Sequence, residues 1–140
     1  MAVSAQRSGL LPITQNGMMF YGDNIAYHDY EGIAFDTAER ERLERDLGQK
    51  FVMILRNHGL LVCGRSAGEA FEILHNLERA CAAQIAALSG GSKLIVPTHE
   101  VCAHTAKQFW GVKSSEPRFG NEAWPAVRRL IDRHNPGYQN

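Results

Sequence analysis

The stretch from Phe51 to Leu88 limits the possible folds of this chain more than any other stretch. Its first part holds two short apolar runs, Phe51–Leu55 and Leu60–Cys63, separated by the sequence Arg-Asn-His-Gly. Short apolar runs on either side of an Asn/Gly break are typical of two buried strands joined by a tight turn. The sequence therefore predicts a strand pair here, with His58 at the turn.

A long amphipathic helix is predicted directly after this strand pair. Ser66 followed by Glu69 has the spacing of a capping box, in which the two side chains satisfy free backbone N–H groups at the start of a helix. Ser89 and two glycines end the predicted helix. Between these limits, apolar residues recur every three or four positions, as expected for one helical face: Ala70, Leu74, Leu77, Cys81, Ile85 and Leu88.

The size and charge of the chain exclude several classes of function. Its 140 residues suit a single domain, residues 1–140, with a core that needs no disulfide or metal. The 15 basic and 15 acidic residues balance, so there is no electrostatic signature of nucleic-acid or membrane-surface binding. The three cysteines are far apart, and Cys63 and Cys81 fall at predicted buried positions. With no secretory leader and no apolar run near roughly 20 residues, a cytoplasmic protein is expected.

The remaining predicted elements are one strand and three helices. Residues 25–30 are β-prone and aromatic, which favours a strand, whereas residues 10–13 contain proline and are expected to be extended. Helices are predicted after caps at Asp36, Thr98 and Asn121. The resulting order of strand, helix, strand, strand and three helices is that of an α/β fold with too few strands for a full sheet.

The predicted helix after Asp36 carries mostly charged residues. Leu43 and Leu47 are its clear apolar anchors, and seven charged residues lie between positions 39 and 46. Alternating charges at helical spacing are typical of a solvated face with salt bridges. The charged run is therefore interpreted as surface and not as a site.

His58 is the first candidate for chemistry. A histidine beside a glycine in a tight turn at a strand end can direct a ring nitrogen into a cleft, which suits a metal ligand or a general base. The alternative is a turn histidine that only bonds to the backbone. The spacing alone favours this alternative.

The segment Tyr27-His28-Asp29-Tyr30 is the second candidate. Adjacent strand residues point to opposite faces, so His28 and Asp29 are not expected to form a catalytic pair, whereas His28 and Tyr30 would share a face. A strand with a solvent-facing histidine is the favoured interpretation. The chain contains no His-x-His or His-Glu-x-x-His sequence and no phosphate-binding glycine loop.

Three segments together resemble the class II aldolase/adducin family, with adducin head domains and bacterial aldolase-like proteins as the nearest types. Each segment is a weak signal, but their order and spacing match the family over about residues 1–92. They are AVSAQRSGLLPITQ at 2–15, AYHDYEG at 26–32, and LRNHGLLVCGRSAGEAF at 55–71 with LERACAAQ at 77–84.

The resemblance implies a partial α/β/α domain with a mostly antiparallel sheet flanked by helices. It also implies a homo-oligomer, commonly a tetramer, with active sites between subunits. Enzymatic members act on sugar phosphates with a divalent metal, usually zinc, bound by a His-x-His pair and one later His. They also use a Glu, and a Tyr from the neighbouring subunit. The later His corresponds to His58. The Tyr falls near residues 26–32, where His28 and Tyr30 are the candidate catalytic residues.

The resemblance further implies that part of the family site lies outside this chain. In the family, the His-x-His pair and the catalytic Glu lie upstream of the segment that corresponds to residue 1. The chain is therefore expected to be the C-terminal part of an N-terminally truncated domain. A catalytic zinc usually has three protein ligands, so a single ligand would hold it weakly. Zinc-dependent aldol cleavage is not expected of this chain alone.

Two other functional interpretations remain open. One is a non-catalytic oligomerisation or interaction module, as in adducin heads, without stoichiometric metal. The other is a fragment with no function of its own, which would expose apolar surface on Val52, Ile54 and Leu61 and self-associate.

Overall fold

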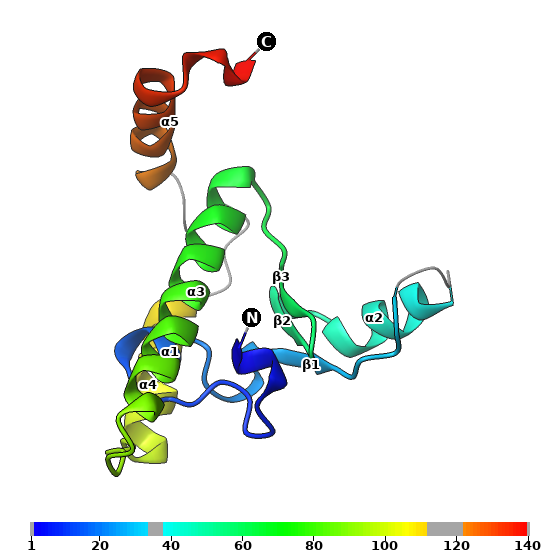
Figure 1. Ribbon diagram of the computed structural model, residues 1–140, viewed down its shortest axis with the longest axis vertical. Coiled ribbons are helices and arrows are strands. Elements are labelled where there is room, and N and C mark those ends of the chain that lie inside the picture. The colour runs from blue at the N-terminus through cyan, green and yellow to red at the C-terminus, as the bar shows by residue number, and fades with distance from the viewer. Residues whose placement is uncertain (1, 34–37, 112–121, 140) are drawn as a thin grey trace.

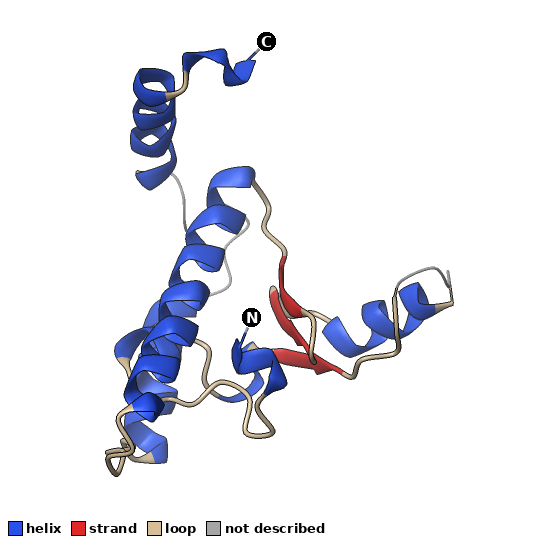
Figure 2. Ribbon diagram, viewed as in Figure 1, coloured by secondary structure: helices blue, strands red, loops and turns tan. Residues whose placement is uncertain are grey.

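The computed structural model describes residues 2–33, 38–111 and 122–139. Within these ranges the chain combines a small sheet with helices on both sides of it (Figures 1 and 2). The elements in chain order are η1 (Ala2–Ala5), α1 (Gln15–Met19), η2 (Gly22–Asn24), β1 (Ala26–His28), α2 (Glu39–Leu47), β2 (Val52–Leu55), β3 (Gly59–Val62), α3 (Ala67–Ser89), α4 (His99–Trp110), α5 (Ala123–His134) and η3 (Pro136–Gln139).

The sheet has the strand order β1-β2-β3 in the described part of the chain. β1 runs parallel to β2, with His28 opposite Leu55, and β2 runs antiparallel to β3. The α/β class is confirmed, although the described sheet is mixed and not mostly antiparallel. The predicted strand pair is confirmed, and Asn57 makes the turn with φ +56, a left-handed conformation that asparagine tolerates.

α3 begins as the sequence predicts. The Ser66 hydroxyl accepts a hydrogen bond from the Glu69 N–H at 3.1 Å, and the Glu69 carboxylate accepts one from the Arg65 N–H. The predicted apolar face is partly wrong, because Leu74 and Leu88 are each 39% exposed. The buried face of α3 is rotated about the helix axis relative to the predicted face. It includes Ile73, Leu77, Ala80, Cys81 and Gln84.

The core lies between α3 and the sheet. One buried cluster joins Phe20 and Val52 to Ile73 and Leu77 of α3, with aromatic residues of α4 packed against it. A second joins Val3, Ile54 and Cys81. Val52 and Ile54 are fully buried, so the expectation that an isolated chain exposes them is wrong. The N-terminal segment and α3 cover them.

Two of the three cysteines are buried. Burial raises the pKa of the Cys81 thiol, and Cys102 is also enclosed. The prediction that Cys63 is a buried strand residue is wrong, because β3 ends at Val62 and Cys63 is exposed.

The N-terminal segment is fixed against α3 by Gln84, whose side chain is fully buried. The Gln84 carbonyl accepts a hydrogen bond from the Leu11 N–H at 2.7 Å, and its amide donates to the Gly9 carbonyl at 2.8 Å and to Gln6 Oε1 at 2.6 Å. Residues 11–13, around Pro12, form neither helix nor strand. The sequence did not indicate α1, which Thr14 caps.

α4 begins at the predicted cap, Thr98, whose side chain accepts from the Val101 N–H. The predicted caps Asp36 and Asn121 lie outside the described residues. α5 projects from the body of the molecule together with the C-terminus (Figure 1), and its Trp124 ring contacts Phe71 at a centroid distance of 5.6 Å. Among the described residues, no helix has the length and apolar character needed to span a membrane.

Candidate functional site

The turn between β2 and β3 holds His58 at the end of the sheet where β1 and β2 finish. The Asn57 N–H donates to the Ser4 carbonyl at 3.1 Å, and Arg56 Nη1 donates to the Gln6 carbonyl at 2.7 Å. The His58 N–H donates to the Leu55 carbonyl, while its side chain is exposed. The turn is thus anchored on η1 and the residue after it, and the imidazole faces outward.

The described residues do not form a metal centre around His58. Among them, no group of three or more His, Cys, Asp or Glu side chains is arranged to hold a metal ion. His58 offers one donor, and a catalytic zinc needs three. The residues present therefore do not fit a complete zinc site.

His28 is buried, which contradicts the prediction of a solvent-facing histidine. Its side chain is 4% exposed, because α2 covers the end of β1. His28 Nδ1 lies 2.8 Å from Asp46 Oδ2. His28 Nε2 has no hydrogen-bond partner among the described residues, and lies 3.8 Å from Glu39 Oε1 and 3.9 Å from Glu31 Oε1. We call His28, Asp46, Glu39 and Glu31 the His28 cluster.

Two carboxylates of this cluster have lowered pKa values. The hydrogen bond with His28, and then the Arg45 guanidinium, lower the pKa of Asp46. The hydrogen bonds from Arg42 lower the pKa of Glu31, whose two oxygens both accept from that guanidinium. Both groups therefore keep their negative charge to lower pH than an unperturbed carboxylate.

Tyr30 does not share a surface with His28. β1 ends at His28, so the alternation that would have placed both side chains on one face stops before Tyr30. The Tyr30 side chain is 55% exposed, whereas His28 is enclosed. The His28 backbone contacts the start of the turn, since its carbonyl accepts a hydrogen bond from the Arg56 N–H at 2.8 Å.

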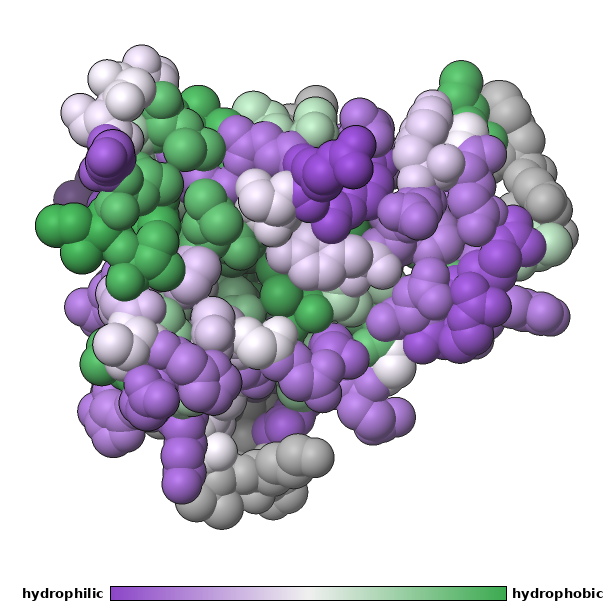
Figure 3. Space-filling view, turned by 90° about the horizontal axis from the view of Figure 1, so that it is seen from below, coloured by the Kyte–Doolittle hydropathy of each residue, from purple (hydrophilic) through white to green (hydrophobic). Residues whose placement is uncertain are grey.

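No sequence pattern predicts the carboxylates around His28. Glu39 and Asp46 belong to the charged run whose spacing is typical of a solvated surface, and they reach His28 because α2 folds back on β1. The rest of α2 does fit that interpretation. Hydrophilic residues gather over the α2 side of the molecule (Figure 3).

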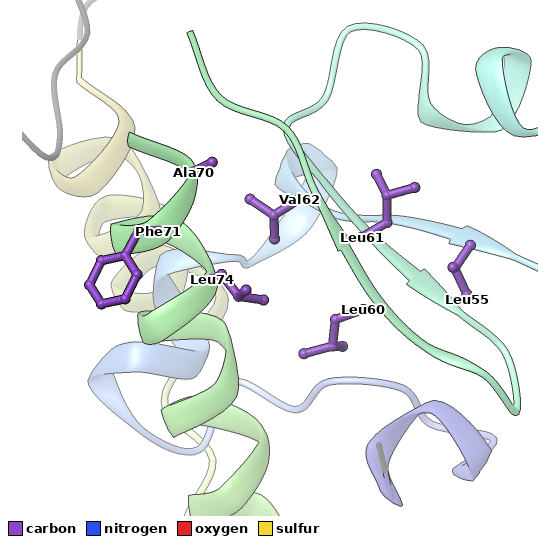
Figure 4. Close-up of a pocket in the computed structure, with 7 residues that line it drawn as sticks. All are labelled: Leu55, Leu60, Leu61, Val62, Ala70, Phe71 and Leu74. Carbon is purple, nitrogen blue, oxygen red and sulfur yellow. The ribbon is translucent and has the colours of Figure 1, made fainter. Parts of the chain in front are cut away.

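A third feature is an apolar groove of about 440 Å³ between β3 and α3, which we call the β3 groove. Side chains from the strands and from the first turns of the helix line it (Figure 4). In the described part of the chain, β2 is the one strand hydrogen-bonded to β3. The lining residues are Leu55, Leu60, Leu61, Val62, Ala70, Phe71 and Leu74.

Comparisons with known proteins agree on one family. A family model described as Class II Aldolase and Adducin N-terminal domain matches residues 1–85. Mouse alpha-adducin (Mus musculus) is 38% identical over 148 residues, which cover 99% of this chain and 20% of that protein.

Two solved structures share the fold. An aldolase II superfamily protein from Pseudomonas syringae has a TM-score of 0.87 and 48% identity, covering 99% of this chain and 55% of that one. An L-fuculose 1-phosphate aldolase from Glaciozyma antarctica PI12 has a TM-score of 0.72 and 25% identity, and the match covers 96% of this chain and 48% of that one. This chain spans about half the length of the aldolase class 2 relatives that it matches.

Proposed function

Because this chain belongs to the class II aldolase and adducin family, we propose that it supplies His58 as one ligand of a divalent metal, most suitably zinc. The site would serve a lyase reaction on a sugar-phosphate-like substrate, with the other ligands coming from polypeptide outside these 140 residues. The observation that carries the proposal is the exposed His58 imidazole, presented by a turn anchored on residues 4–6. A bound divalent ion would polarise the substrate oxygen.

Within this proposal the chain's own residues have different roles. His58 would bind the metal ion. Tyr30 is exposed beyond the end of β1, and its phenol would act at the site of a neighbouring subunit. His28 is enclosed, so it acts by positioning α2 and does not touch substrate. Among the described residues no group of three or more His, Cys, Asp or Glu side chains is arranged to hold a metal, so the chain alone is not expected to catalyse aldol cleavage.

Metal content tests the role of His58. We expect a chimera, in which the rest of the Pseudomonas syringae relative completes residues 1–140, to bind about one zinc per chain. His58→Ala should lower this about tenfold, because two remaining ligands hold the ion weakly. His104→Ala, at an exposed position of α4, is the control. Elemental analysis after dialysis gives the measurement, and undiminished zinc in the His58→Ala chimera would refute the assignment.

A non-catalytic oligomerisation module is the second candidate, and the β3 groove favours it. The side chains that line the groove are apolar, and the groove borders the edge of β3 that has no partner strand among the described residues. Edge strands of monomeric proteins often carry charged residues or are covered, whereas the four-residue strand β3 carries three consecutive large apolar residues, Leu60–Val62. A second copy that pairs with this edge would cover the groove and form a homo-oligomer.

Self-association can be tested with two leucines that have the same exposure on the same helix. Leu74 lines the β3 groove, Leu88 does not, and both are 39% exposed. We expect Leu74→Glu to raise the dissociation constant of the oligomer about tenfold or more, because it buries a charge at the interface. Leu88→Glu should change it little. Sedimentation velocity over a concentration series gives the constants, and equal effects of both variants would exclude the groove as the interface.

A further inference from the structure

The connection between α3 and α4 exposes apolar side chains at one end of the molecule (Figure 1). Ile95 is 90% exposed and Val96 is 56% exposed, and Val101, in the first turn of α4, is 49% exposed. We call these three residues the α3–α4 patch. Hydrophobic residues gather at this end of the molecule, on the left of Figure 3. Apolar surface gathered in this way marks an interaction site more often than scattered exposed residues do.

The backbone of the same connection is open to a partner strand. Residues 91–98 form neither helix nor strand, and within the described part of the chain no backbone hydrogen bond involves residues 92–96. The sequence Lys-Leu-Ile-Val at 93–96 is β-prone, and Pro97 ends it. A β-prone segment with unpaired N–H and C=O groups is a template on which another extended segment can pair. A polypeptide strand therefore fits this surface better than a lipid or a small apolar ligand.

Opposite charges stand at the two ends of this segment. Lys93 begins it, and Glu100 follows it in the first turn of α4. Both side chains are exposed, and neither has an ion-pair partner among the described residues. Hydrogen bonds from its own N–H and from Thr98 lower the pKa of Glu100, so its carboxylate is anionic at neutral pH.

This order of charges makes the segment complementary to a second copy of itself. In an antiparallel pair, the first residue of one segment lies beside the end of the other. Lys93 of each copy would then lie near Pro97 and the start of α4 in the other copy, where Glu100 stands. Opposite charges across paired strands attract, whereas a parallel pair would bring like charges together.

We propose that two copies of this chain pair antiparallel through residues 93–96, about a two-fold axis that places the two α3–α4 patches against each other. The apolar side chains are then removed from water, and the backbone groups of the segment gain partners. A two-fold contact is closed, so association through it stops at a dimer. Pro97 limits the paired region to these four residues. The contact requires neither His58 nor the β3 groove.

Sedimentation velocity of the 140-residue chain over a concentration series tests the pairing. All measurements are made with Leu74→Glu present, so that association through the β3 groove does not contribute. We expect this protein still to form a dimer, and Ile95→Glu to raise its dissociation constant about tenfold or more, because a charge is buried at the interface. Ile33→Glu changes another exposed isoleucine, outside the patch, and should leave the constant unchanged. A monomer at every concentration, or equal effects of Ile95→Glu and Ile33→Glu, would overturn the proposal.

Two charge variants test the antiparallel arrangement. Lys93→Glu and Glu100→Lys should each weaken the dimer about tenfold, because each creates two symmetric like-charge contacts. An equimolar mixture of these two variants should form a heterodimer about as tight as the parent dimer, since every contact then joins opposite charges. The double variant Lys93→Glu/Glu100→Lys should recover the parent constant for the same reason. If Ile95→Glu fails to fold by circular dichroism, these charge variants decide the matter. A mixture that associates no better than either variant alone would refute the pairing.

Discussion

Replacing Gln84 with leucine is expected to lower the free energy of unfolding by about 3 kcal/mol. Leucine has nearly the volume of glutamine, so the packing of α3 is preserved while the hydrogen bonds are lost. The Leu11 N–H and the Gly9 carbonyl would each lose their Gln84 partner, at a cost of about 1–3 kcal/mol each. The whole N-terminal segment would be loosened, since Gln84 is its fully buried anchor on the helix.

Urea denaturation measures this change. We expect the midpoint to fall with the slope unchanged, and the melting temperature to fall by about 6–12 °C. Gln49→Leu makes the same replacement at an exposed position and should alter stability by no more than about 0.5 kcal/mol. A Gln84→Leu protein as stable as the parent would show that the three hydrogen bonds contribute no net stability.

Gly9→Ala is expected to cost about 2–4 kcal/mol. A Cβ at Gly9 would lie 2.5 Å from the Tyr27 hydroxyl and 2.6 Å from its ring. The ring has little freedom to move, because the Arg56 guanidinium lies over it at 4.4 Å and the Leu10 N–H donates to its hydroxyl. Gly9 also has φ +65, which alanine adopts at a cost of about 1 kcal/mol.

Gly22→Ala separates the backbone cost of a positive φ from the steric cost of the contact with Tyr27. Gly22 has φ +71, but a Cβ there would meet nothing within 4 Å. Its substitution should therefore show the backbone cost alone, about 1 kcal/mol. Thermal unfolding of both variants, followed by circular dichroism, gives the comparison. Equal destabilisation would mean that Tyr27 moves aside freely.

Elements whose signals lie within a few positions of one another in the sequence could be predicted. The strand pair β2–β3, the Ser66 cap and the Thr98 cap are encoded within a few positions of one another. α1 is only five residues long and contains a glycine, so its helical pattern is too short to detect. Its docking on α3 and α4 is a tertiary effect.

The orientation of α3 and the surroundings of His28 could not be predicted. A periodic stripe of apolar residues does not show that Gln84 points inward, because its partners lie 73–78 residues away. The contact of His28 with Asp46 spans 18 residues and two elements. Within a run of seven charges, nothing local distinguishes Asp46 from its solvated neighbours.

The buried Gln84 also determines when the N-terminal segment can pack during synthesis. Gln6 is made 78 residues before the side chain that accommodates it. At about 5–20 residues per second, translation leaves the N-terminal segment without its anchor for about 4–16 s. During that interval the apolar residue Val3, fully buried in the finished protein, has no α3 to pack against. Nascent chains that end before α3 has emerged would therefore present this segment to chaperones and proteases.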